Sequence, residues 1–183
     1  MTYILIILAL VVVWVVFTYN GFVRLRNRAK EAWADIDVQL KRRYDLIPNL
    51  VNSVKGYAIH ETEAFENVTK ARAAAISAGG TADKSGKETA LSGALKSIFA
   101  IAEAYPELKA NQNFLSLQNE LADTENKIQA ARRFYNTNVR DLNTGLESFP
   151  GNLIKGIGKF EHMEFFELEE GEGKARNPVE VKF

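Results

Sequence analysis

The first 23 residues carry no charged side chain, and this uncharged run constrains the chain more than any other feature. From residue 3 to residue 19 the sequence reads YILIILALVVVWVVFTY. About 20 residues of α-helix span about 30 Å, which matches the hydrocarbon core of a bilayer. Inside lipid such a segment must be helical, because its backbone groups find no water to bond. We therefore predict a transmembrane anchor over residues 1–23.

A cleaved signal peptide is the rival interpretation. It requires a basic region before the apolar segment and a cleavage site made of small residues. Met1 and Thr2 supply only the terminal amine, and the sequence WVVFTYNGF offers no A-x-A pattern. Tyr3 and Tyr19 lie near the two ends of the run, where amphipathic aromatic residues favour the membrane interface. These observations favour a retained anchor.

A basic collar follows the uncharged run and precedes the first acidic residue, Glu31. It consists of Arg24, Arg26, Arg28 and Lys30. The positive-inside rule predicts that this flank lies in the cytoplasm and the N-terminus outside. Alternatively, these side chains snorkel to the interface, and the two descriptions are compatible. Anionic lipid would bind them at about 1 kcal/mol per basic residue. We expect a single-pass protein whose first partner is the lipid bilayer.

Apolar residues then recur at steps of three and four from Leu25 to Ala58. This period predicts an amphipathic helix that is continuous with the anchor. Pro48 lies inside it, where a proline removes one backbone hydrogen bond and clashes with the carbonyl of Tyr44. Because the apolar pattern continues past Pro48, we expect a kink and not the end of the helix.

Three more helices are predicted downstream. The second covers roughly residues 62–78 and ends at a glycine pair, which begins a polar loop over 79–87. Ser85 and Glu88 have the spacing of a capping box and would start the third helix. Pro106 suits the first residue of a long fourth helix, which would end at the Phe149-Pro150-Gly151 break.

These patterns predict an all-α fold. Four amphipathic helices with short connections, two of them long, favour an antiparallel bundle into which the transmembrane helix continues. We place the anchor at 1–23, the helical bundle at 24–149 and an irregular C-terminal tail at 150–183. In the tail, Leu153, Ile154, Ile157 and Phe160 could dock on the bundle. Its last stretch has six glutamates between residues 161 and 172 and is expected to be extended and mobile.

The residue types that carry catalysis are sparse. The absence of cysteine excludes thiol catalysis and Cys-ligated zinc, and the common hydrolase and nucleotide-binding motifs are missing. His60 with Glu63 and Glu66 could be a metal site, but bundle metal sites need Glu-x-x-His pairs on two helices. A polar helix start explains these residues better. We expect no catalytic activity, no cofactor and no metal.

Charge also narrows the range of partners. The chain has 23 basic and 23 acidic residues, and outside the basic collar and the acidic tail the two signs are interspersed. A nucleic-acid-binding domain would normally present a basic face. We therefore expect no nucleic-acid partner.

The densest polar segment is DIDVQLKRRYDLIPNL, residues 35–50. Arg43 lies near the apolar stripe, and Asp45 and Asn49 flank Pro48. One interpretation is a paired, buried network or a subunit contact. The other is a solvated helix face with pairs four residues apart, such as Asp37 with Lys41, and spacing alone favours it.

Several stretches resemble the bacterial LemA family. They are AWADIDVQLKRRYDLIPNLVNSVKGYAIHETEAFENVTKARAAA at 32–75, YNGFVRLRN after the anchor, FLSLQNELADTENKIQAARRFYN and the FPGNLI turn. The resemblance covers nearly the whole chain and implies a single-pass protein of the bacterial inner membrane with a cytoplasmic helical bundle. It implies no enzymatic activity, and one branch is associated with magnetosome membrane formation. Seven positions belong to the family motif without a known role: Trp33, Asp37, Arg42, Arg43, Asp45, Pro48 and Asn49.

Two functions remain open at this stage. The first is a membrane-anchored helical scaffold that forms homo-oligomers and organises or shapes membrane, as the heptad-like seams and the anchor suggest. The second is a membrane-tethered sensor or adaptor, which binds a ligand, a peptide or a membrane-protein partner through the bundle and uses Pro48 as a hinge.

Overall fold

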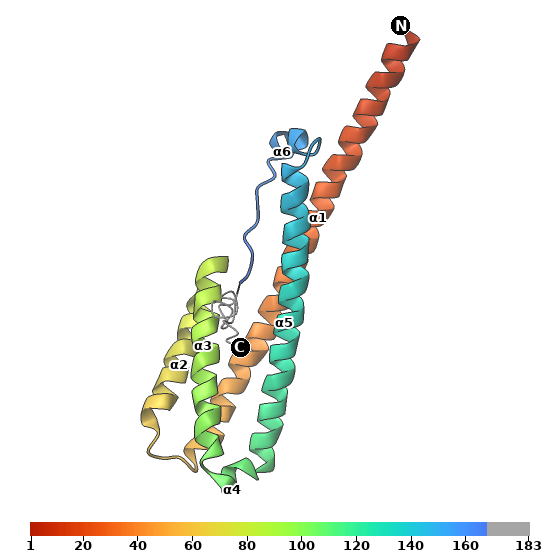
Figure 1. Ribbon diagram of the computed structural model, residues 1–183. Helices are drawn as coiled ribbons and strands as arrows, with labels where there is room; N and C mark the ends of the chain where they lie inside the picture. Colours follow the sequence, from red (N-terminus) through yellow and green to blue (C-terminus); the bar gives the residue numbers. More distant parts are fainter. Residues whose placement is uncertain (168–183) are drawn as a thin grey trace, which may run out of the picture. The chain divides into compact units, whose positions relative to one another are not determined.

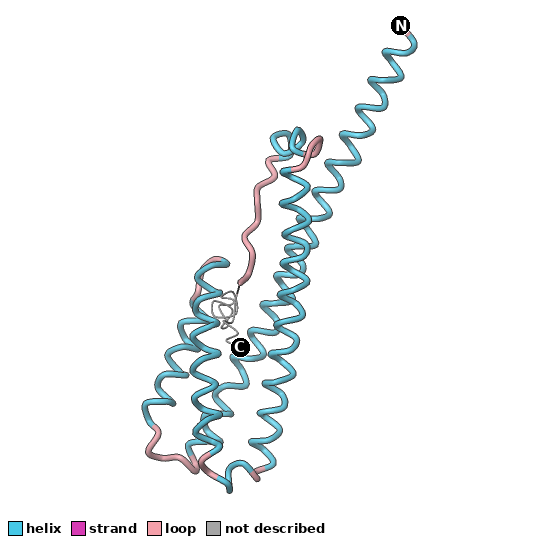
Figure 2. The backbone as a smooth tube through the Cα atoms, viewed as in Figure 1, coloured by secondary structure: helices cyan, strands magenta, loops and turns pink. Residues whose placement is uncertain are grey.

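The computed structural model describes residues 1–167, and every regular element in that range is a helix (Figures 1 and 2). This confirms the predicted all-α fold. The described helices are α1 (Thr2–Lys55), α2 (Thr62–Ser77), α3 (Thr81–Glu103), α4 (Pro106–Lys109), α5 (Gln112–Glu147) and α6 (Asn152–Gly158).

The chain forms two compact units, which we describe separately. Unit 1 contains residues 1–38 and 128–165. Unit 2 contains residues 39–127 together with Phe166 and Glu167. The long helices α1 and α5 are divided between the units, so that each helix has one part in unit 1 and the other part in unit 2.

Helix α1 is unbroken from Thr2 to Lys55, with Pro48 inside it. The expectations that the anchor and the first bundle helix are continuous and that Pro48 does not end the helix are confirmed. Helicity also persists through Asn20 and Gly21, the position at which a flexible linker would most easily have formed.

Unit 2 is a bundle built from the end of α1, α2, α3 and the beginning of α5 (Figure 1). Its core side chains are aliphatic and aromatic and follow the predicted helical period. Among them are Leu40, Ile47, Leu50, Phe65, Leu91, Ile98 and Leu121. The turn from α2 to α3 passes through Gly80 at φ 83°, a conformation that glycine adopts without steric cost.

Two predicted helix starts are wrong. Helix α3 begins at Thr81, so the polar residues 81–87 are helical and the predicted loop is short. Ser85 and Glu88 do not form a capping box, because both lie inside α3 on its buried face. The carboxylate of Glu88 forms a buried ion pair, so its polarity does not mark a place where the backbone leaves the helix.

The second error concerns the long C-terminal helix. Pro106 does occupy the first turn of a helix, but that helix is the short α4, which ends at Lys109. The long helix α5 starts at Gln112. Asn111 causes the separation, since its side-chain oxygen accepts hydrogen bonds from the backbone N–H groups of Asn113 and Phe114, at 2.9 and 3.2 Å. This is the N-cap geometry that begins a new helix.

Unit 1 packs α1, the second part of α5 and α6 around one apolar cluster. The cluster contains Phe22, Leu142, Leu146, Ile154 and Phe160, with Trp14, Val15, Val23, Leu25 and Met163 partly buried against it. The aromatic ring of Phe160 meets the rings of Tyr19 and Phe22 edge-on, at centroid distances of 5.4 and 5.5 Å. Apolar packing therefore joins the end of the uncharged run to the chain that follows α5.

The predicted docking of the tail is half right. Ile154 and Phe160 are buried in the core of unit 1, whereas Leu153 and Ile157 are 61% and 69% exposed. Beyond α6, residues 160–167 are not helical. The more acidic residues 168–172 lie outside the described part of the chain.

Candidate functional site

Arg43 is the most unusual side chain in unit 2, because it is charged and only 1% exposed. It lies on α1 in register with Ile36, Leu40, Ile47 and Leu50, so the helical period itself turns it toward the core. A buried charge must be paired and hydrogen-bonded to be tolerated. For Arg43, the interpretation as part of a solvated helix face is therefore wrong and the buried network is confirmed.

Two helices, α3 and α5, supply the partners of Arg43. From α3, Glu88 forms an ion pair with the guanidinium and is itself fully buried. From α5, Glu125 Oε2 accepts a hydrogen bond from Arg43 Nη1 at 2.7 Å. Ser92 Oγ lies 3.4 Å from the same nitrogen. We call this group, together with Tyr44, the ionic network.

Tyr44 completes the ionic network from the neighbouring position on α1. Its hydroxyl donates a hydrogen bond to the second carboxylate oxygen of Glu88 and lies 3.4 Å from the carbonyl oxygen of Ala75 on α2. Glu88 thus receives a guanidinium on one oxygen and a phenol on the other. The contacts of Arg43, Tyr44 and Glu88 therefore join α1, α2, α3 and α5.

The ionic network borders a small cavity of about 270 Å³. Leu95, Phe99 and Leu121 give it an apolar lining, and Lys96 and Gln118 add polar groups. Arg43 Nε and Glu125 Oε1, which belong to lining residues, are buried and have no hydrogen-bond partner within residues 1–167. A concave apolar site with a few polar groups is the usual form of a small-molecule site.

Other motif positions have different surroundings. Arg42 is exposed and forms an ion pair with Asp123 at 3.7 Å. A hydrogen bond from Lys127 lowers the pKa of the Asp123 carboxyl, and the charges of Lys127 and Arg42 act in the same direction. Asp45, Pro48 and Asn49 are exposed on α1.

The remaining two motif positions belong to unit 1. Trp33 is half-buried, with its ring centroid 5.2 Å from that of Tyr135 on α5. Asp37 is half-buried as well. The polar side chains of block 35–50 thus form a buried network at Arg43 and Tyr44 and a partly solvated surface at the other polar positions.

The basic collar lies in unit 1. Arg24, Arg28 and Lys30 are exposed. Arg26 is partly buried, with its guanidinium carbon 5.3 Å from the centre of the Phe160 ring, a cation–π contact. Phe160 therefore contacts both the end of the uncharged run and the collar.

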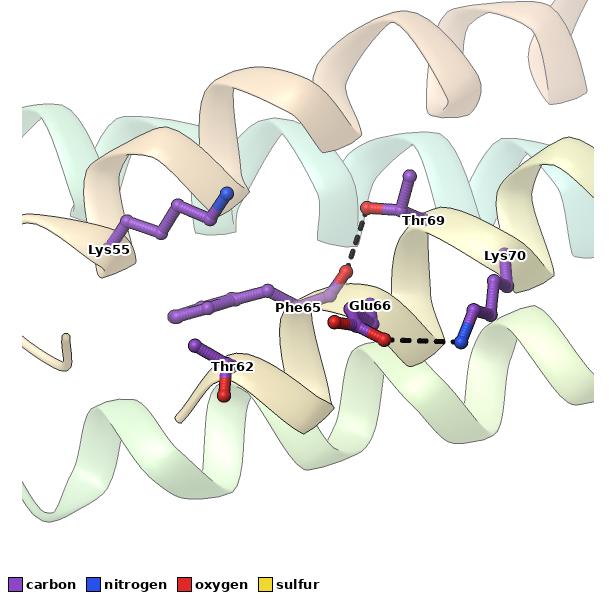
Figure 3. A pocket seen from close by; sticks show the side chains of 6 residues that line it. All are labelled: Lys55, Thr62, Phe65, Glu66, Thr69 and Lys70. Carbon is purple, nitrogen blue, oxygen red and sulfur yellow. Dashed lines mark hydrogen bonds and ion pairs between the residues drawn. The ribbon is translucent and has the colours of Figure 1, made fainter. Parts of the chain in front are cut away.

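A second pocket of about 310 Å³ lies between the end of α1 and the start of α2 (Figure 3). Its charged side chains already have contacts. Lys55 stands 5.6 Å from the Phe65 ring centre, and Lys70 pairs with Glu66 at 3.2 Å. His60, Glu63 and Glu66 are not gathered in the structure, and within residues 1–167 no group of three or more such side chains lies close enough together to hold a metal ion.

Sequence reasoning found Arg43 but missed Glu88 and Glu125. The missed signal for Glu88 is its register on α3, three residues before Leu91 and seven before Leu95, which places the carboxylate on the buried stripe. An acid in register with an apolar stripe, in a chain that also places an arginine in such a stripe, predicts a buried pair.

Comparison with known proteins gives consistent matches. The model of the LemA family matches residues 32–183, a range that contains the whole ionic network. Magnetosome protein MamQ of Magnetospirillum gryphiswaldense is 24% identical over 174 residues, which cover 81% of this chain and 64% of that protein. Magnetosome protein MamQ 2 of Paramagnetospirillum magneticum is 23% identical over 175 residues, with the same coverage.

Protein LemA of Metamycoplasma hominis is 26% identical over 139 residues, which cover 74% of this chain and 62% of that protein. The chain thus spans less than two thirds of the length of these relatives.

Proposed function

The chain belongs to the LemA family, and from this premise we propose that it is a membrane-anchored helical scaffold that self-associates and organises or shapes membrane, without a catalytic step. The relatives named as magnetosome proteins support a role in organising membrane. For location we propose the bacterial inner membrane, with a single pass, the N-terminus outside and the bundle in the cytoplasm.

One observation carries this proposal. The same helix, α1, begins with an apolar segment long enough to cross a membrane and continues as a core helix of both units. Large apolar side chains at positions 3–13 are exposed, which water would not favour and lipid would. Within the described residues, α1 is the one helix with this length and composition.

Exposed apolar side chains outside the span support self-association. In unit 1, Val38 on α1 is 62% exposed and Phe134 on α5 is 54% exposed. Apolar and aromatic side chains are the groups that anchor contacts between subunits. We propose that these two positions lie in the contact between copies, with a further membrane-protein partner as the alternative occupant.

Disulfide cross-linking in native membranes tests self-association, because the chain has no cysteine of its own. The variants are Val38→Cys and Phe134→Cys. Arg140→Cys is the control, since it is exposed and lies six residues from Phe134, on another face of α5. We expect dimers at positions 38 and 134 and monomers at 140. Monomers at all three positions, with no recurring partner, would contradict the scaffold.

Orientation is tested with a thiol reagent that does not cross membranes. In intact cells stripped of the outer membrane, Thr2→Cys should react and the exposed Ser97→Cys should react only after lysis. The reverse pattern would contradict the proposed topology and leave self-association open.

The cavity beside the ionic network favours a second candidate function, that of a sensor or adaptor. Its apolar lining and the unpartnered oxygen of Glu125 suit a small molecule with an apolar body and a hydrogen-bond donor. The sensor hypothesis keeps Pro48 as the hinge toward the membrane.

Hexylamine is a simple probe of the cavity. We expect it to shift the NMR signals of Leu95 and Leu121 methyl groups in the full-length protein, and Glu125→Gln to abolish the shift. Leu50, buried elsewhere in unit 2, serves as the control signal. Unchanged cavity signals at saturating probe, or equal shifts at Leu50, would remove the basis for this second function.

A further inference from the structure

The turn that contains α6 exposes three large apolar side chains. Phe149 is 80% exposed, and Leu153 and Ile157 are 61% and 69% exposed. Leu153 and Ile157 are four residues apart and therefore share a face of α6. Ile154, the residue after Leu153, is buried in the core of unit 1. We call the first three residues the α6 surface.

The position of α6 along α1 suggests what covers this surface. The core to which α6 belongs is packed against Trp14, Val15 and Phe22, all within the uncharged run. Figure 1 shows α6 at the end of α5, alongside α1. The last ten residues of the predicted membrane span, 14–23, are therefore flanked on one side by protein.

The length of the membrane span on α1 limits the depth at which α6 can lie. Residues 3–13 precede the flanked part of α1 and amount to about 16 Å of helix. This is about half of the 30 Å hydrocarbon core that a span must cross. The remaining length comes from residues 14–23, which carry α6 beside them. When α1 crosses the bilayer, α6 is brought to the boundary between acyl chains and headgroups.

We propose that the α6 surface is a second membrane contact, in which Phe149, Leu153 and Ile157 enter the edge of the hydrocarbon core. This inference rests on the proposed anchoring of α1. Lys155 and Lys159 alternate with the apolar residues of α6 and reach the headgroups, as basic side chains at an interface do. Their charge suits anionic lipid, as does that of the basic collar on α1.

This contact gives the anchor a defined depth and a defined rotation. A lone helix can slide and rotate in a bilayer at little cost. Helix α6 is held against α1 by Ile154, which shares a core with Phe22, and by Phe160 just after the helix, whose ring meets those of Phe22 and Tyr19. Inserting the α6 surface therefore selects one depth and one rotation of α1 in the bilayer. A scaffold that orders its copies in the membrane plane requires both to be defined.

Environment-sensitive labels on single cysteines test the proposal in the full-length chain. The protein is reconstituted in vesicles of phosphatidylcholine and phosphatidylglycerol, and an NBD label is placed through Leu153→Cys or Ile157→Cys. Leu10→Cys reports on the anchor. Arg133→Cys, exposed on α5 in unit 1, is the aqueous reference. Quenching is measured with iodide in water and with a doxyl group near the headgroup on a lipid.

We expect labels at 153 and 157 to lose most iodide quenching and to gain quenching by the doxyl lipid, while the label at 133 shows the opposite. If labels at 153 and 157 behave like 133 while 10 is shielded, the anchor stands and the α6 contact is refuted. If 10 is also open to iodide, both fail. Labels at 153 and 157 that neither quencher reaches would show that a second copy covers α6, which also overturns the proposal.

Charge variants test the contact of Lys155 and Lys159 with headgroups separately from the apolar contact. In the Ile157→Cys background, Lys155→Glu with Lys159→Glu should raise iodide quenching in vesicles that contain phosphatidylglycerol. The matched control, Lys84→Glu with Lys87→Glu on α3, should leave it unchanged. If the two double substitutions raise iodide quenching equally, Lys155 and Lys159 do not contact the headgroups, and that part of the proposal is refuted.

Discussion

The carbonyl oxygen of Tyr44 accepts a hydrogen bond from Arg72 Nε at 2.7 Å. In a regular α-helix this carbonyl would bind the backbone N–H four residues later, but that position is Pro48, which has none. Arg72, on α2, supplies a donor where the proline removes one. The proline thus creates a docking point between two helices of unit 2 without ending α1.

This relationship predicts that Pro48 and Arg72 are energetically coupled. Arg72→Met should lower the free energy of unfolding by about 1–2 kcal/mol, because a partly buried carbonyl loses a donor. In the Pro48→Ala background the new backbone N–H binds that carbonyl, and the loss should shrink by about 1 kcal/mol. Unfolding of the full-length protein in micelles, in a double-mutant cycle, measures the coupling. Additive effects would show that Arg72 does not compensate for the proline.

The ionic network predicts a large difference between two glutamates. Glu88→Ala should destabilise the protein by about 3 kcal/mol, because it leaves Arg43 buried with a partner missing. Glu66→Ala breaks the exposed pair with Lys70 and should cost less than about 0.5 kcal/mol. Thermal unfolding followed by circular dichroism compares the two variants. Equal losses would mean that the network contributes no more than a surface pair.

Two helical glycines should respond to alanine with opposite signs. A Cβ added at Gly145 would lie 2.8 Å from the Phe22 ring, so Gly145→Ala should cost about 1–3 kcal/mol through overpacking. Gly93 has nothing within 4 Å of the same position, and Gly93→Ala should stabilise α3 by about 0.5–1 kcal/mol. Urea unfolding gives both values. A neutral Gly145→Ala would indicate that Phe22 can move aside.

Periodicity predicts the helices of this chain well, because most core positions follow one rule. Leu40, Ile47, Leu121 and Ile128 lie where the three- and four-residue steps place them, and all are buried. The anchor and the first bundle helix form one helix for the same reason, since no signal between Tyr19 and Leu25 is strong enough to end it. The helical part of the fold was therefore accessible from sequence.

The errors arise where a polar residue has a tertiary role. Ser85 and Glu88 have the spacing of a capping box, yet the partner that holds Glu88 in place is Arg43, 45 residues earlier. Local spacing cannot reveal that pairing, because it is made between helices. Asn111 was missed for the opposite reason: its role is local, but the stronger signal of Pro106 nearby assigned the helix start elsewhere.

Asn143 holds the chain that follows α6 by two hydrogen bonds to Met163. Its Nδ2 donates to the Met163 carbonyl oxygen at 2.9 Å, and its Oδ1 accepts from the Met163 N–H at 3.0 Å. The hydroxyl of Tyr135 donates to the Glu164 carbonyl oxygen at 2.8 Å. These bonds replace the helical ladder that residues 160–167 lack, so this segment keeps its place through α5 side chains.

The two hydrogen bonds between Asn143 and Met163 predict that substitutions at Asn143 loosen residues 160–167 to different degrees. Asn143→Ala removes both bonds and should raise the hydrogen-exchange rate of the Met163 amide by roughly tenfold, since about 1.4 kcal/mol of local stability corresponds to that factor. Asn143→Asp keeps an acceptor for the Met163 N–H and should have a smaller effect. Thr144→Ala, exposed next to Asn143, is the control and should leave exchange unchanged. If Asn143→Ala exchanges no faster than this control, packing of Phe160 alone holds the segment, and the side-chain bonds are incidental to it.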